Sequence, residues 1–75
     1  MYQVKIEEAG RIKMPTNTYY AETLGITSSY VSSILNGKLP VKQIVAKGML
    51  CIAYNITMDD PLMDELLEKH FEKIK

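Results

Sequence analysis

The stretch that decides the fold runs from residue 17 to residue 38 and reads NTYYAETLGITSSYVSSILNGK. Ala21 is a small residue, suited to the point where one helix touches the next. Gly25 follows four residues later and tolerates the positive φ of a tight turn, and Ile26 then provides an apolar plug. This spacing predicts a first helix with Tyr20, Ala21 and Leu24 facing inward, ended by a turn at Gly25.

A second helix is expected from Ser28 to about Leu35. Thr27 precedes it and has the hydroxyl that caps free N–H groups at a helix start. Val31, Ile34 and Leu35 fall at helical spacing and predict a buried stripe, while Asn36-Gly37 predicts the stop. The segment 17–36 therefore predicts two short helices joined by a turn.

Two further helices are expected beyond this pair, over residues 40–54 and 60–74. Asp60 is a capping residue for the last helix, and Pro61 suits its first position, where a missing N–H costs nothing. We expect the inner face of the third helix to carry Ile44, Val45, Gly48, Met49, Ile52 and Ala53. The stripe of the last helix is expected to carry Leu62, Met63, Leu66, Leu67, His70 or Phe71, and Ile74.

Residues 1–15 show a period of two rather than a helical period. Tyr2, Val4 and Ile6 alternate with polar residues, and Ile12 and Met14 do so after Glu8-Ala9-Gly10. The pattern predicts an N-terminal β-hairpin closed by Pro15, with a short helix as the alternative.

Composition limits the remaining choices. The 75 residues are 47% hydrophobic and 24% charged, which predicts a single folded domain over 1–75. The lone Cys51 excludes a disulfide scaffold, and no Cys/His spacing indicates a zinc finger. The longest nearly apolar run, 48–54, is far short of the roughly 20 residues that span a bilayer. With no signal peptide visible, we expect a cytoplasmic protein without membrane contact.

Charge is balanced overall but unevenly distributed. Residues 1–58 hold six basic and three acidic residues, whereas residues 59–75 hold three basic and six acidic residues. The asymmetry predicts separate roles for a basic body and an acidic C-terminal helix, the latter as a possible surface for a protein partner or a second copy.

Residues 21–38, AETLGITSSYVSSILNGK, resemble the lambda-repressor/Cro-like (Xre) helix-turn-helix family of phage and mobile-element regulators. The resemblance covers about residues 16–56. It implies a mainly α, compact helix-turn-helix domain of about four helices, here with the N-terminal β-hairpin in place of the usual first helix. It also implies that helix 28–35 lies in the major groove of DNA.

Carried over residue by residue, the resemblance assigns ten positions to double-stranded DNA. They are Asn17, Thr18, Thr27, Ser28, Ser29, Tyr30, Ser32, Ser33, Asn36 and Lys38. The hydroxyls can donate or accept toward base edges or phosphates, and Tyr30 suits a sugar or a thymine methyl group. Serine discriminates weakly between bases, and no charged residue lies between Thr23 and Gly37.

Nothing in the sequence indicates catalysis, a metal or a cofactor. His70 is the only histidine and has no nucleophile or carboxylate spaced for catalysis, so we expect it to be exposed or at an interface. Tyr19, Tyr20 and Tyr54 are expected in the core or at its edge, and Cys51 as a small buried hydrophobe.

The functional hypothesis is a repressor-like transcription regulator that binds a palindromic operator as a homodimer. The alternative is a protein-interaction module of a phage or mobile element, such as an anti-repressor or an inhibitor of host defence, with weak or no DNA binding. Zero net charge and the uncharged second helix favour this alternative.

Overall fold

The computed structural model describes residues 1–74. Its four α-helices are α1 (Asn17–Leu24), α2 (Ser28–Leu35), α3 (Gln43–Tyr54) and α4 (Met63–His70). Two short strands, β1 (Tyr2–Val4) and β2 (Phe71–Lys73), lie near the ends of the chain, and two 3-10 turns, η1 (Ile6–Glu8) and η2 (Arg11–Lys13), follow β1. The expectation of a compact, mainly α fold of about four helices is confirmed.

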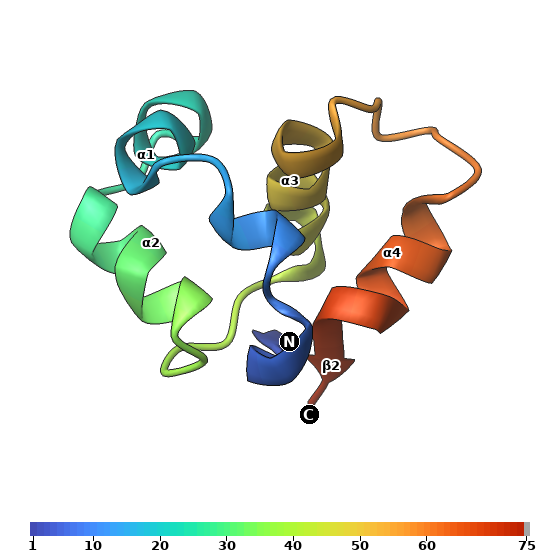
Figure 1. Ribbon diagram of the computed structural model, residues 1–75, viewed down its shortest axis with the longest axis horizontal. Helices are drawn as coiled ribbons and strands as arrows, with labels where there is room; N and C mark the ends of the chain where they lie inside the picture. Colours follow the sequence, from blue (N-terminus) through green and yellow to red (C-terminus); the bar gives the residue numbers. More distant parts are fainter. Residues whose placement is uncertain (75) are drawn as a thin grey trace.

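Helix α3 lies in the middle of the molecule. Figure 1 shows α1 and α2 together on one side of it and α4 on the other, with the two chain ends side by side below. The pair α1–α2 and the acidic helix α4 therefore occupy opposite ends of the domain.

The helix pair has the predicted cap at Thr27 and the predicted turn at Gly25, together with a second threonine cap at Thr16. The Thr16 hydroxyl accepts from the Tyr19 N–H at 3.0 Å, and the Thr27 hydroxyl accepts from the Tyr30 N–H at 3.1 Å. Gly25 ends α1 with a φ of 72°, the left-handed region that glycine enters without strain. Both helices thus begin at a threonine cap, and the turn between them depends on one glycine.

The inner faces of this pair match their sequence stripes. Tyr20 and Ala21 of α1 are buried, as are Val31, Ile34 and Leu35 of α2. Tyr19 departs from the expectation, because 55% of its surface is exposed. On a helix, Tyr19 and Tyr20 point about 100° apart, so only one of them can face the core.

Helix α3 begins at Gln43, three residues later than expected, because Val41 forms a β-bridge with Tyr2. Its buried residues are Ala46, Met49, Leu50 and Ala53. Ile44, expected inside, is 68% exposed, so the inner face is rotated from the predicted one. Gly48 lets α1 approach α3 closely, because a Cβ on it would lie 3.0 Å from Leu24 Cδ2.

The sheet is antiparallel and two-stranded, with one strand near the N-terminus, but its second strand is not residues 11–14. β1 pairs with β2 in the register Tyr2↔Lys73, Gln3↔Glu72 and Val4↔Phe71. Val4 and Phe71 are both buried, so this pairing places an apolar pair directly across the strands. The hairpin predicted over residues 1–15 is therefore wrong in its partner strand.

Residues 6–13 form the two 3-10 turns instead of continuing as a strand. Ala9 and Ile12 lie three residues apart and are both almost fully buried, which one turn of 3-10 helix allows. In an extended strand Ile12 would share a face with Met14, which is 72% exposed.

The last helix is shorter than the predicted 60–74, because the chain becomes extended at Phe71. It also begins later than predicted, at Met63, so Asp60 is not its N-cap and Pro61 not its first residue; the Asp60 carboxylate accepts from the Leu62 N–H at 2.9 Å in the turn before the helix. Met63 and Leu67 of the predicted stripe are buried, while Leu62 is exposed.

His70, at the end of α4, is 1% exposed, which corrects the expectation of an exposed or interface histidine. Its Nδ1 contacts the main-chain carbonyl oxygen of Glu8, and its Nε2 lies 2.5 Å from the Tyr54 hydroxyl. A carbonyl can only accept, so Nδ1 carries a proton, and in the neutral ring Nε2 accepts from Tyr54. The histidine thus fastens η1, α3 and α4 together.

Candidate functional site

The outer face of α2 is a surface of small hydroxyl side chains. Its first turn is the most accessible part: Thr27, Ser28 and Ser29 are exposed, and Tyr30 is 36% exposed. Ser32 and Ser33 are half-buried one turn later. This face is free because Val31, Ile34 and Leu35 turn the opposite side of α2 into the core.

A shallow hollow connects α2 with the start of α1. It is about 200 Å³ in volume, and the residues that line it are Lys13, Asn17, Ser32, Leu35 and Asn36. Three of the ten positions assigned to DNA are therefore brought together here, although 15 residues separate Asn17 from Ser32 along the chain. Thr18, Thr27, Ser28, Ser29 and Tyr30 are exposed but do not line this hollow.

Ser33 and Lys38, two further assigned residues, lie near the end of α2. The Asn36 side-chain amide lies 3.4 Å from the Ser32 hydroxyl, and the Asn36 N–H donates to the Ser32 carbonyl oxygen at 3.0 Å. The Lys38 N–H donates to the Ser33 carbonyl oxygen at 2.9 Å, and its side chain is exposed. These bonds, with Gly37 at a φ of 71°, hold the chain as it leaves the helix.

Lys13 was not among the positions assigned from the sequence. It lies in η2, ahead of Pro15, and reaches the hollow because the segment before α1 turns back across the domain. The positive charge of residues 1–58, to which Lys13 contributes, was visible in the sequence. The sequence did not predict that Lys13 lies beside α2, because this position depends on the 3-10 turn η2, and the alternating pattern had indicated a strand there.

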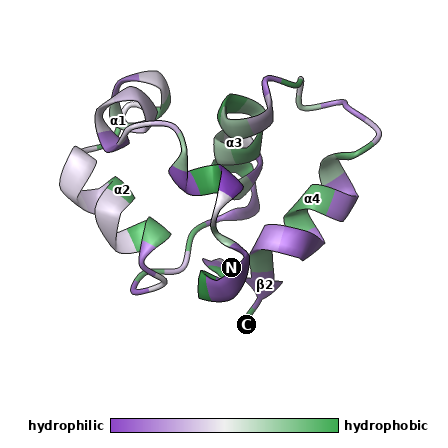
Figure 2. Cartoon of the chain, in the orientation of Figure 1, coloured by the Kyte–Doolittle hydropathy of each residue, from purple (hydrophilic) through white to green (hydrophobic). Residues whose placement is uncertain are grey.

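The charges near this surface are sparse and mainly positive. α2 has no charged side chain. Lys13 lies near α2 in space, Lys38 follows α2 in the chain, and Glu22 is on α1. Figure 2 shows α2 as pale and green, whereas α4 at the other end alternates strongly hydrophilic and hydrophobic residues. The acidic side chains of α4 are thus kept away from the hydroxyl surface.

Cys51 and His70 lie outside the hydroxyl surface. Among residues 1–74, no group of three or more His, Cys, Asp or Glu side chains is placed to hold a metal ion. Cys51 is half-buried with its Sγ 3.4 Å from Met58 Sδ, and burial raises the pKa of its thiol, which keeps the thiol protonated. His70 is used in the buried contacts with Glu8 and Tyr54.

Comparisons of this chain with protein-family models, with curated proteins and with solved structures find no match. Within residues 1–74, every helix is too short or too polar to cross a membrane.

Proposed function

We propose that this protein binds double-stranded DNA in a sequence-specific manner, with α2 as its recognition helix. The observation that carries the proposal is the joint exposure of the α2 hydroxyl face and the start of α1, which share the hollow lined by Lys13, Asn17, Ser32 and Asn36. The first turn of α2 is exposed, and α1 comes directly before α2 in the chain. This arrangement fits the docking geometry in which the first turn of the recognition helix contacts base edges in the major groove.

Base contacts fall to the first turn of α2. Ser28 and Ser29 offer hydroxyls that donate or accept, and Tyr30 offers an aromatic edge to a thymine methyl group or a sugar. The Thr27 hydroxyl already accepts from the Tyr30 N–H and retains its own hydrogen to donate to a phosphate.

Phosphate contacts fall to the residues around the hollow. Lys13 supplies positive charge, while Asn17 and Asn36 supply amide donors on either side of it. Lys38 adds a second cation beyond the end of α2. With two cations near the helix, electrostatic attraction is modest, and specificity comes from fit rather than charge.

The biological role that follows is a transcription regulator, repressor-like, in the cytoplasm of a bacterial host, of the kind found in phages and mobile elements. Serine contacts give weak discrimination per site, so two copies on a palindromic operator are needed for useful selectivity. The two recognition helices would enter successive major grooves about one helical turn apart. Occupancy of the operator then blocks polymerase.

Selection from random duplex DNA, at low and at near-physiological salt, tests the proposal. Enrichment of one motif, with an inverted repeat spaced by about one turn, is the expected result. Weak binding that disappears as salt rises, without enrichment of any motif, would contradict it.

The second candidate is a protein-interaction module that uses the same face of α2. The observation that favours it is the absence of charge from residues 24–37, which suits a protein partner better than a phosphate backbone. Under this alternative, DNA affinity stays weak, and Ser28 or Ser29 variants alter binding to a protein rather than to DNA.

A further inference from the structure

The small sheet has one closed edge and one open edge. On the closed side, the Tyr2 N–H donates to the Val41 carbonyl oxygen and the Val41 N–H donates to that of Tyr2, both at 2.7 Å. On the other side of β1, Ile74 and Met1 exchange bonds of 2.8 and 3.1 Å, and the Lys5 N–H donates to the His70 carbonyl oxygen at 2.8 Å. The order across the sheet is therefore Val41, β1, β2.

The alternation of an antiparallel ladder fixes which groups of β2 face outward. Residues 70, 72 and 74 face β1, so the main-chain groups of Phe71 and Lys73 point away from it. The Phe71 N–H returns to the Leu67 carbonyl oxygen. The Phe71 carbonyl and the Lys73 N–H and carbonyl have no hydrogen-bond partner within residues 1–74. Open main-chain groups of this kind are where a further strand adds.

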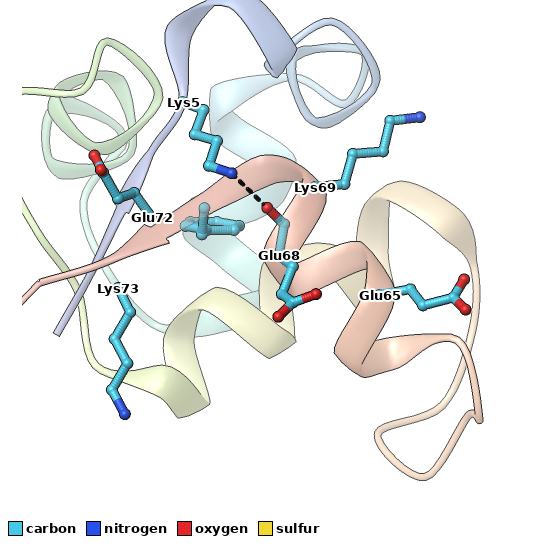
Figure 3. A pocket seen from close by; sticks show the side chains of 7 residues that line it. Lys5, Glu65, Glu68, Lys69, Glu72 and Lys73 are labelled. Carbon is cyan, nitrogen blue, oxygen red and sulfur yellow. Dashed lines mark hydrogen bonds between the residues drawn. The ribbon is translucent and has the colours of Figure 1, made fainter.

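Two hollows lie along this edge, and Glu65, Glu68, Phe71 and Lys73 line both of them. The register places Lys5 and Glu72 on one face and Tyr2 and Lys73 on the other. Figure 3 shows Glu72 and Lys73 pointing to opposite sides of β2, with Glu68 of α4 to their right and Glu65 farther away along α4. The hollow on the Glu72 side is about 680 Å³, and the one on the Tyr2 side is about 420 Å³. Side chains at alternate positions of an added strand, on the Tyr2 face of the sheet, would enter the smaller hollow.

The charges of the two hollows differ. The residues lining the Tyr2-side hollow are Tyr2, Gln43, Asp64, Glu65, Leu67, Glu68, Phe71 and Lys73, which gives three carboxylates to one ammonium. The other hollow is balanced, with Glu65, Glu68 and Glu72 against Lys5, Lys69 and Lys73, and the Lys5 ammonium is held 2.8 Å from the Glu68 carbonyl oxygen. A cationic side chain fits the first hollow and a neutral polar one fits the second.

We propose that the open edge of β2 binds an extended segment of another protein, with Lys or Arg at alternate positions facing Asp64, Glu65 and Glu68. Main-chain bonds to the exposed Lys73 supply the affinity, and the carboxylates of α4 select the charge pattern. The surface lies on the α4 side of the domain, on the edge of the sheet away from α2, so a partner can occupy it while α2 is engaged.

A second copy of this chain is a poor occupant of the same edge. When two copies pair antiparallel about a two-fold axis, two residues that lie opposite each other either both point their main-chain groups toward the partner strand or both point them away. The pairing is then centred on Glu72 or on Lys73, and either arrangement sets like charges directly opposite. Centring on Phe71 would instead bring α4 of one copy against Lys73 of the other.

The test uses a fluorescein-labelled peptide of about eight residues with Lys and Thr alternating, measured by fluorescence anisotropy and by amide chemical shifts. We expect saturable binding that shifts the amide signals of Phe71 and Lys73. Replacing each Lys by Glu in the peptide should abolish binding. The Lys73→Pro variant should weaken binding by about tenfold or more, because proline lacks the outward N–H. The bonds between β2 and β1 are kept, since the Lys73 N–H does not take part in them.

Lys73→Thr is the matched control: it removes the charge and keeps the N–H, so it should bind the peptide at least as tightly as the unaltered protein. The double variant Glu65→Gln, Glu68→Gln should bind the peptide more weakly than the unaltered protein does. This difference in affinity should shrink as the salt concentration rises, because salt screens the charges. Equal binding by Lys73→Pro and Lys73→Thr would overturn the proposal, as would no binding up to about 1 mM peptide. A protein dimer that Lys73→Pro dissociates would overturn the choice of partner.

Discussion

The phenol hydroxyl of Tyr20 donates a hydrogen bond of 2.6 Å to the main-chain carbonyl oxygen of Ile12, and both residues are fully buried. This bond joins α1 to the segment that precedes it. The oxygen of Ile12 lies in η2, between the buried Ala9 and the start of the helix pair. It is one of the few polar contacts that fix where η2, and with it Lys13, lies against α1.

The Tyr20→Phe variant should lower the free energy of unfolding by about 1–3 kcal/mol, because the Ile12 carbonyl then stays buried without a donor. Urea unfolding at neutral pH measures this. Burial raises the pKa of Tyr20 above its ordinary value of about 10, so the folded state holds the phenol proton more tightly than the unfolded state.

The stability that Tyr20 contributes is therefore complete below about pH 10 and is lost as the pH rises further. Phenylalanine does not titrate, so the difference between the two proteins should shrink at alkaline pH. A difference that stays constant with pH would show that the Tyr20 phenol is not buried in the folded state.

The two glycines at Gly25 and Gly10 should respond oppositely to alanine. Gly25 has a φ of 72° with open space around it, so Gly25→Ala should cost about 1 kcal/mol through backbone strain alone. Gly10 also has open space but a φ of −49°, so Gly10→Ala should be neutral or stabilise by up to about 1 kcal/mol. Thermal unfolding of both variants decides, and equal shifts would rule out the left-handed turn.

The helix pair could be predicted from the sequence because its signals are local. The cap at Thr27, the left-handed Gly25 and the stripe through Val31 and Ile34 all act within one or two turns of the chain. The same locality explains why most of the assigned surface residues of α2 are accessible: a helix with one apolar stripe exposes the remainder.

The sheet could not be predicted in the same way. The alternation of Tyr2 and Val4 indicates a strand but not its partner, and the partner, Phe71–Lys73, lies at the other end of the chain. A local pattern therefore assigned β1 to the nearest alternating segment. The position of Lys13 beside Asn17 was missed for the same reason, since it follows from the turn that replaced the second strand.

In its neutral form, the histidine at the end of α4 should be a single tautomer with its proton on Nδ1. The Glu8 carbonyl oxygen accepts only, and the Tyr54 hydroxyl is then the donor to Nε2. Nitrogen-15 NMR of the ring distinguishes the two tautomers directly. Tyr54→Phe should lower stability by about 1 kcal/mol, because Nε2 loses its donor inside the domain. A tautomer protonated on Nε2 would contradict this arrangement.

The proposed DNA contacts are of two kinds, phosphate contacts and base contacts. The salt dependence of affinity reports the phosphate contacts, and the preference between DNA sequences reports the base contacts. Lys13→Ala should weaken binding to every duplex similarly and lower the slope of log affinity against log salt by about one, because it removes one phosphate contact. Ser28→Ala or Ser29→Ala should leave that slope unchanged and relax the preference at one base position, by about 1 kcal/mol or more. Lys69→Ala, the same substitution on exposed α4, is the matched control and should change neither quantity. If Lys69→Ala and Lys13→Ala reduce affinity equally, the attraction comes from the charge of the whole protein, and α2 does not direct the contact.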